Sequence, residues 1–293
     1  MKTIFIDDKG NYRIGWKIAF AFITATFVSL ISTIFSGLIY RNIHINSFSN
    51  MINDTMNTNW GHALCSLINI MLLYFVYRIL AKHKNNFWNH MGFSSYKPVA
   101  MSLIGFLSGM IFCTVYIIPL FIAGQLEIEF ISLTPNTIIT LLTGLIIYAG
   151  VSFSEEITFR GYIQHYLSEK NKYLGIFATS AIFAVMHLIN SSYSPLSLIY
   201  LFLGGVAFSL MRIVTKGIWF SMAFHLAWNW SEITVFGLNS NIPAKRWFFA
   251  TVTSESIWTG KDGSSGLAVI LVLISCITVL IYIRTKYKSH TRV

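Results

Sequence analysis

The chain has 293 residues, of which 55% are hydrophobic and only 11% charged, and its mean hydropathy is +0.62. Soluble domains usually carry about 25% charged residues, so this composition excludes an ordinary soluble protein and predicts an all-α polytopic membrane protein. The net charge of +10 need not indicate a nucleic-acid partner, because in a membrane protein the placement of Lys and Arg matters more than their sum. We expect membrane lipid around the chain and no nucleic acid.

Apolar runs of membrane-spanning length recur along the whole chain. A transmembrane helix needs about 20 mostly apolar residues. The first run is far longer than the roughly 7–15-residue apolar core of a cleavable signal peptide, so we interpret it as an anchor. The fourth is expected to continue as a helix to about Ser168, since only Gly161 interrupts it. We predict about eight transmembrane helices, in chain order residues 18–40, 61–80, 99–123, 137–159, 173–190, 196–213, 217–236 and 266–283.

The Lys and Arg residues indicate the orientation of these helices. With the N-terminus inside, 17 of the 21 fall in inner segments, and four fall in outer ones. The positive-inside rule therefore predicts a multi-pass protein with cytoplasmic N- and C-termini. We divide the chain into an N-terminal three-span segment without motifs (1–136), a four-span catalytic core (137–236), and an outer loop with the final transmembrane helix (237–293).

The fourth expected span contains charges that are costly in a membrane. Each carboxylate at mid-bilayer costs about 2.5–3.5 kcal/mol on insertion scales, yet Glu155 and Glu156 are adjacent, and Arg160 follows. Glu156 and Arg160 are four residues apart, so they share a helix face and are expected to pair. Glu155 lies about 100° around the helix from Glu156, so it is free to face a different partner.

The fifth span offers a partner for Glu155. Glu155 lies 14 residues before the polar turn that starts at Glu169, and His187 lies 15 residues after that turn ends at Lys172. At 1.5 Å per residue, an antiparallel pair of helices puts both side chains about 20 Å from the turn. Phe183 lies four residues before His187, on the same helix face. We therefore expect Glu155 and His187 to lie at matching depth.

The seventh span adds His225 and Asn229, again four residues apart on one face. The same arithmetic from Gly217 places them about 12–18 Å from the cytoplasmic turn. Polar contacts between membrane helices are often structural. Three polar faces at compatible depth nevertheless predict one functional site.

The residue types in this site favour water activation over covalent catalysis. None of the expected spans contains an HExxH, GxSG or GxGD motif. A carboxylate acting with a histidine is a suitable general base, and a second histidine with an asparagine would supply donors to an oxyanion. Alternatively, Glu155, His187 and His225 would hold a Zn²⁺ whose bound water is the nucleophile. The residues alone leave the metal open.

Three stretches resemble motifs of the CPBP family, which comprises CAAX proteases and bacteriocin-processing or self-immunity proteins. Residues 155–162, Glu-Glu-Ile-Thr-Phe-Arg-Gly-Tyr, resemble EExxxR-G-[FY]. Residues 183–187 resemble FxxxH, and residues 225–229 resemble HxxxN. The motifs occur in the family's order and spacing, within about residues 140–232.

The resemblance implies an intramembrane endopeptidase of class EC 3.4, related to the Ras-converting CAAX prenyl protease. By analogy, Glu155 with His187 activates the water, while His225 and Asn229 form the oxyanion site. Family members are commonly labelled metalloproteases, which keeps Zn²⁺ as a cofactor to consider. The expected catalytic residues are thus Glu155, Glu156, His187, His225 and Asn229, with Arg160 and Phe183 in support.

The substrate is less constrained than the site. Family analogy allows prenylated CAAX proteins in eukaryotes, and peptide precursors or immunity functions in bacteria. The length and the Ile-, Asn- and Lys-rich composition favour a bacterial cell membrane, and a peptide or protein substrate in bacteriocin processing or self-immunity. A non-catalytic scaffold or immunity protein of the same fold is the alternative. An ion-coupled transporter would also use buried Glu and His, but the sequence lacks the broken helices in matching halves typical of one.

Overall fold

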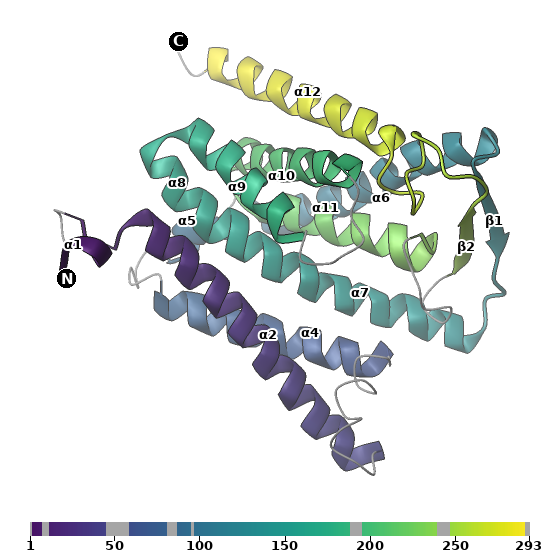
Figure 1. Ribbon diagram of the computed structural model, residues 1–293, viewed down its shortest axis with the longest axis horizontal. Helices are drawn as coiled ribbons and strands as arrows, with labels where there is room; N and C mark the ends of the chain where they lie inside the picture. The colour runs from purple at the N-terminus through teal and green to yellow at the C-terminus, as the bar shows by residue number, and fades with distance from the viewer. Residues whose placement is uncertain are drawn as a thin grey trace.

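The computed structural model describes residues 2–7, 12–44, 59–80, 87–94, 97–187, 195–238 and 247–290. Almost all regular structure in these ranges is helical (Figure 1). The helices are α1 (Lys2–Phe5), α2 (Ile14–His44), α4 (Asn59–Leu80), α5 (Phe87–Met91), α6 (Pro98–Ile122), α7 (Pro135–Glu155), the π-helix η1 (Glu156–Ile163), α8 (Gln164–Lys170), α9 (Lys172–His187), α10 (Pro195–Thr215), α11 (Trp219–Asn229), the π-helix η2 (Trp230–Val235) and α12 (Leu267–His290). The strands are β1 (Leu126–Phe130) and β2 (Phe248–Val252).

Six helices in the described ranges are long and apolar enough to cross a membrane, which confirms the all-α polytopic fold. The expected spans 173–190 and 217–236 correspond to α9, of 16 residues, and to α11 with η2, both shorter. Residues 188–190 lie outside the described part, and the total of eight spans stays a prediction. The six are Ile14–Ile39, Trp60–Ile79, Pro98–Ile122, Pro135–Lys170, Pro195–Thr215 and Leu267–Lys286.

Local sequence sets the ends of the helices that carry the site. At the start of α7, the Thr134 hydroxyl accepts a hydrogen bond from the Thr137 amide, and Pro135 occupies the first turn; both features favour a helix start. Between α8 and α9, the Asn171 side chain accepts from the amide of Tyr173 at 2.8 Å. The polar turn expected at residues 169–172 is therefore present, and α8 and α9 form a helical hairpin.

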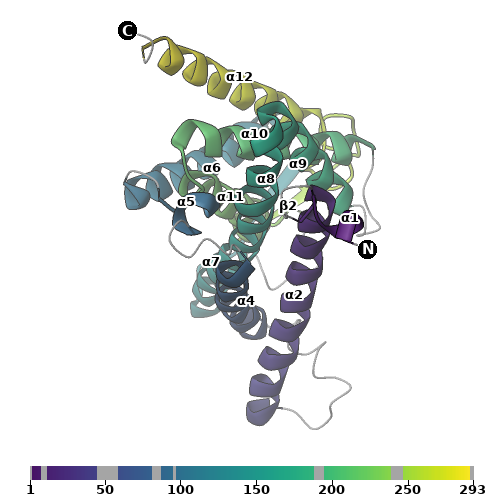
Figure 2. The same ribbon diagram turned by 90° about the vertical axis from the view of Figure 1, so that its left-hand side faces the viewer.

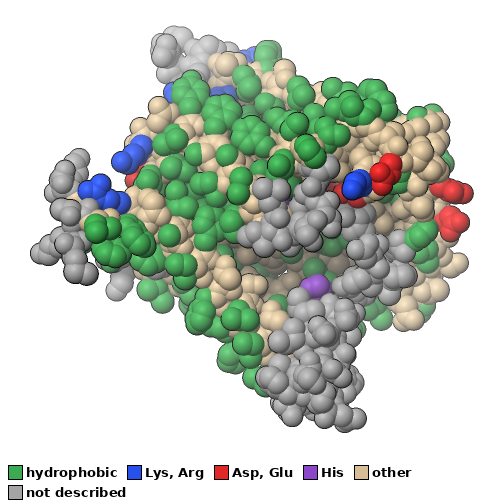
Figure 3. Space-filling model, viewed as in Figure 1, with side chains coloured by type: hydrophobic (Ala, Val, Ile, Leu, Met, Phe, Trp, Pro, Cys, Tyr) green, Lys and Arg blue, Asp and Glu red, His purple; other side chains and the backbone are tan. Residues whose placement is uncertain are grey.

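The two ends of the helix bundle differ in structure and charge. α1 and the C-terminal end of α12 lie at one end, and the sheet of β1 and β2 lies at the other (Figure 1). This sheet, absent from the sequence expectation, pairs Leu126 with Val252 in antiparallel register and joins the segment after α6 to the segment before α12. In Figure 3, hydrophobic side chains cover much of the visible face, Lys and Arg gather mainly toward the α1 end, and acidic side chains lie near the sheet. The predicted cytoplasmic N-terminus would place the α1 end on the inner side of the membrane, and this orientation stays a prediction.

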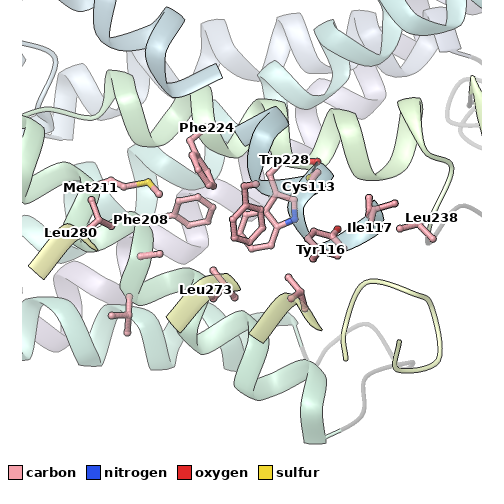
Figure 4. Close-up of a cluster of buried hydrophobic side chains, with 14 of the residues drawn as sticks. Cys113, Tyr116, Ile117, Phe208, Met211, Phe224, Trp228, Leu238, Leu273 and Leu280 are labelled. Atoms are coloured by element: carbon pink, nitrogen blue, oxygen red, sulfur yellow. Dashed lines mark hydrogen bonds between the residues drawn. The ribbon is translucent and has the colours of Figure 1, made fainter. Parts of the chain in front are cut away.

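Two buried hydrophobic clusters meet around the expected site. One joins α6, α10, α11 and α12 and includes Phe208 and Trp228 (Figure 4). The other joins α2, α4, η1 and α9 and includes Phe183. α2 and α12 lie on opposite sides of the bundle, and the far end of α2 leans away from the other helices (Figures 1 and 2). The inner helices thus enclose the polar residues, while α2 and α12 expose apolar side chains where lipid is expected.

Candidate active site

The chain changes from α-helix to π-helix at the two expected carboxylates. Glu155 is the last residue of α7, and all eight residues of η1, Glu156–Ile163, are buried. The helix then continues as α8 to Lys170, so continuation past Ser168 is confirmed, but its regular α-helical form is not. π-helical turns widen the helix and occur frequently at functional sites. Their formation depends on tertiary contacts that hydropathy does not report.

Glu156 and Arg160 form the expected ion pair inside the protein. An Arg160 guanidinium nitrogen lies 3.1 Å from Oε1 of Glu156, and both side chains are fully buried. The guanidinium also donates to the Gly205 carbonyl at 3.3 Å and lies over the rings of Phe183 and Phe208, at 4.5 and 4.8 Å from their centroids. Desolvation makes a buried ion pair costly, and the two aromatic faces offset part of that cost.

Glu155 faces histidines from two other helices. Its Oε1 lies 4.0 Å from Nε2 of His187 on α9, and its Oε2 lies 3.7 Å from Nε2 of His225 on α11. The Glu155 and His187 side chains are 25% and 21% exposed, so a small molecule can reach them, whereas the His225 side chain is 5% exposed. The Glu155 carboxylate therefore brings together His187 and His225, although His225 lies 70 positions later in the sequence.

The contacts of His187 define its protonation pattern. Its Nδ1 lies 2.8 Å from the Phe183 carbonyl oxygen. Since a carbonyl only accepts, Nδ1 carries the hydrogen, and Nε2 presents a lone pair toward Glu155 in the neutral ring. The 4.0 Å separation is too long for a hydrogen bond and suits a bridging water. The Phe183 ring also packs on His187 at 4.6 Å, so both backbone and ring of Phe183 orient the imidazole.

His225 is held on two sides, and Asn229 follows one turn later. Nδ1 of His225 lies 3.3 Å from Oε1 of Glu156, and its ring stacks on Phe208 at 4.5 Å and 20°. Asn229, the last residue of α11, is half-buried. Among the residues that the structure describes, its side chain forms no hydrogen bond with Glu155, His187 or His225. The structure brings together the other six expected site residues: Glu155, Glu156, Arg160, Phe183, His187 and His225. Asn229 follows His225 by one helical turn and makes no hydrogen bond to Glu155 or to the two histidines within the described ranges.

The donor atoms do not fit a zinc ion as they are placed. Both imidazoles have the Nδ1–H partner usual for zinc-bound histidine. In a tetrahedral site with bonds of about 2.0–2.1 Å, however, ligand atoms are about 3.3 Å apart, less than the 4.0 and 3.7 Å between Glu155 and the two histidines. Across the described ranges, no three His, Cys, Asp or Glu side chains converge on a metal position.

The sequence interpretation missed several residues around the site. Phe208 looks like any apolar residue of a span, so nothing in the sequence marks it. Arg212 belongs to the basic residues of the predicted inner segments, and its guanidinium donates to the carbonyls of Arg160 and His90. Glu232 in η2 is 4% exposed and accepts hydrogen bonds from Tyr116 and Trp228. A carboxylate within the predicted span 217–236 was a visible signal for that residue.

A comparison with known protein families finds a match over part of the chain. Residues 136–231 match the model of the family described as Type II CAAX prenyl endopeptidase Rce1-like. The match covers about one third of the chain, and it includes Glu155, Glu156, Arg160 and both site histidines. No curated protein and no solved structure matches the chain.

Proposed function

We propose that this chain, whose residues 136–231 match the Rce1-like family of type II CAAX prenyl endopeptidases, is an intramembrane endopeptidase in which Glu155 and His187 activate the attacking water. The family match supports the general class, a CAAX-type membrane protease. The specific proposal of water activation rests on the Glu155 carboxylate, which faces Nε2 of both His187 and His225 at 4.0 and 3.7 Å.

The proposed reaction begins with a water between Glu155 and His187. The carboxylate accepts one hydrogen bond and orients the water, and Nε2 of His187 accepts a proton as the oxygen attacks the peptide carbonyl. The carbonyl oxygen becomes an oxyanion, which donors from His225 and Asn229 stabilise. Breakdown of the tetrahedral intermediate returns the proton to the leaving amine, so the products are a new carboxylate and a new amino terminus.

Glu156 and Arg160 serve this chemistry indirectly. Glu156 accepts from Nδ1–H of His225, which fixes the ring so that its Nε2 faces the carboxylate of Glu155. Donation to an oxyanion then requires a second hydrogen, on Nε2 of His225. Arg160 neutralises Glu156 and holds it in place. Residues 137–236 would thus form the catalytic core.

We propose a peptide or protein substrate in a bacterial cell membrane, in bacteriocin processing or self-immunity, with both termini of the chain cytoplasmic. The composition and the basic α1 end support this assignment. A Zn²⁺ held by Glu155, His187 and His225 is the alternative mechanism, and it requires these three side chains to move closer together. A non-catalytic scaffold or immunity protein is the alternative function, and it requires no chemistry from Glu155.

The test compares the peptides of cells that produce the wild-type protein with those of cells that produce Glu155→Gln. We expect a set of peptide termini present with the wild type and lost with Glu155→Gln. Identical termini, together with an unchanged immunity phenotype, would support the scaffold instead. Exposed Glu129 on β1 gives the matched control, because Glu129→Gln makes the same chemical change away from the site.

A further inference from the structure

α11, which carries His225, packs unusually closely against α6. A Cβ atom at Gly105 would lie 2.4 Å from the carbonyl oxygen of Phe220, and one at Gly109 would lie 2.5 Å from that of Phe224. One turn further, the Cys113 thiol donates to the Trp228 carbonyl at 3.5 Å. Small residues let membrane helices approach in this way. In each contact the partner lies 115 residues later in the chain, so the helices run parallel in one register.

These three contacts hold the helices close, but they are chemically alike. Each one sets a small residue of α6 against a backbone carbonyl of α11. If α11 shifted by four residues, Gly105 would meet the Phe224 carbonyl and Gly109 the Trp228 carbonyl, which recreates two similar contacts. The inner end of α11 is held separately, because the Ile218 amide donates to Gly92 at 2.9 Å. To hold the outer end of α11 in one register against α6, a chemically different contact is required.

Glu232 supplies that contact. Its Oε2 accepts hydrogen bonds from the Tyr116 hydroxyl and the Trp228 indole, both at 2.7 Å. Figure 4 shows Cys113, Tyr116 and Trp228 grouped in the buried cluster between these helices. A buried carboxylate costs more than a hydrocarbon side chain of similar size, so stability alone does not account for Glu232. A single polar group in an apolar helix interface does specify register.

We infer that Glu232 is a positioning residue that fixes the rotation and depth of the outer half of α11. Glu232 lies seven residues, about two turns, after His225 and three after Asn229. Fixing it therefore keeps His225 directed at Glu155 and Glu156 and keeps Asn229 at the site. The inference rests on the proposed function, because it assigns Glu232 an effect on His225 in catalysis.

The experiment uses the full-length protein in proteoliposomes and an internally quenched peptide that spans a cleavage site mapped by comparing the peptide termini of wild-type and Glu155→Gln cells. A displacement of about 1 Å can lower turnover by about 100-fold, so we expect Glu232→Leu to lower kcat to that extent with little change in KM. Glu232→Gln should retain most of the activity, because its amide oxygen can accept from both Tyr116 and Trp228. Tyr116→Phe, which removes one of the two donors to Glu232, should lower kcat by an intermediate amount. It replaces Glu232→Leu as the test if that variant fails to fold.

The control is Thr234→Val, because Thr234 is buried in the same π-helix but faces α7, where a Cβ at Gly144 would lie 2.6 Å from its hydroxyl. Its kcat should match that of the wild type. In a background that carries both His225→Ala and Asn229→Ala, Glu232→Leu should cause no further loss, since misplaced side chains and absent ones are equivalent. An unchanged kcat in Glu232→Leu, or a further loss of the same size in that background, would overturn the inference.

Failure of the proposed function gives a different result. If the wild-type protein leaves the peptide intact, or if Glu155→Gln cleaves it normally, the protease proposal is wrong. Hydrogen–deuterium exchange, which needs no cleavage, then tests whether Glu232 fixes the outer half of α11. Amides of residues 225–235 should exchange faster in Glu232→Leu and not in Glu232→Gln; equal protection in both variants contradicts the inference.

Discussion

Oε1 of Glu156 lies 3.1 Å from an Arg160 guanidinium nitrogen and 3.3 Å from Nδ1 of His225. One buried oxygen therefore connects the charged pair of η1 with an imidazole from α11. This contact separates the roles of the two adjacent glutamates, because Glu155 is partly exposed and faces both Nε2 atoms, whereas Glu156 is enclosed. The predictions below follow from that division.

Glu155→Gln should lower kcat by about 10²–10⁴-fold, because a neutral amide replaces the carboxylate that orients the water. The melting temperature should stay near that of the wild type, since Glu155 is partly exposed and pairs only loosely. Cleavage of the quenched peptide and thermal unfolding in detergent measure the two effects. Glu129→Gln is the matched control, and normal turnover in Glu155→Gln would exclude Glu155 from catalysis.

Arg160→Met should destabilise the protein by about 3–5 kcal/mol, because it leaves the Glu156 carboxylate buried without its partner. Adding Glu156→Leu should restore much of the stability without restoring activity, since the interior then lacks the unpaired charge but His225 lacks its acceptor. Thermal unfolding compares these variants with Lys172→Met, which removes an exposed cation. Equal stability of Arg160→Met and Lys172→Met would contradict the buried-pair argument.

Asn229→Ala should lower kcat by about 10²–10³-fold, the usual loss of an oxyanion donor. Its stability should barely change, because the Asn229 side chain makes no hydrogen bond to the other site residues within the described structure. A large fall in melting temperature with normal turnover would instead identify Asn229 as a packing residue.

Removal of metal should leave cleavage intact. Glu155, His187 and His225 are too far apart for zinc as they are placed, so dialysis against 1,10-phenanthroline should not change kcat. Elemental analysis of the dialysed protein verifies that metal is gone. Activity that disappears on dialysis and returns with Zn²⁺ would show that the three side chains do close around an ion.

Gly109→Ala should destabilise the protein by about 1–3 kcal/mol, because its new methyl group would lie 2.5 Å from the Phe224 carbonyl and 2.9 Å from Ala227. The same substitution at Gly15, which has open space around it, should be neutral or stabilising by up to about 1 kcal/mol. Thermal unfolding of both variants checks the pair, and equal stability would mean that α6 and α11 separate easily.

Much of this arrangement was predictable because membrane insertion penalises polar residues so strongly. Counting residues from the turn at 169–172 predicted matching depth for Glu155 and His187, and their side chains lie 4.0 Å apart. Counting could not predict that Oε1 of Glu156 faces His225, because that depends on how α7 and α11 are rotated. The same limit hid Phe208, which contacts both Arg160 and His225 only after α10 has packed.

The π-helix and the β1–β2 sheet escaped prediction for another reason. Both depend on hydrogen bonds between distant segments, such as Arg212 with the Arg160 carbonyl and Leu126 with Val252. Hydropathy averages over neighbouring residues and carries no information on such pairs. The two short helical segments, α9 and α11 with η2, carry both site histidines.

The extra residue in each turn of η1 has a consequence for insertions and deletions. Removing a single residue between Ile157 and Phe159 would let this stretch relax toward an ordinary α-helix. Arg160 would then lie three residues after Glu156 in an α-helix instead of four residues after it in a π-helix, which moves the guanidinium relative to the aromatic rings that enclose it. A chain without Thr158 would keep an apolar span, but it would lose the spacing between the two glutamates and Arg160 and, with it, the geometry of the site.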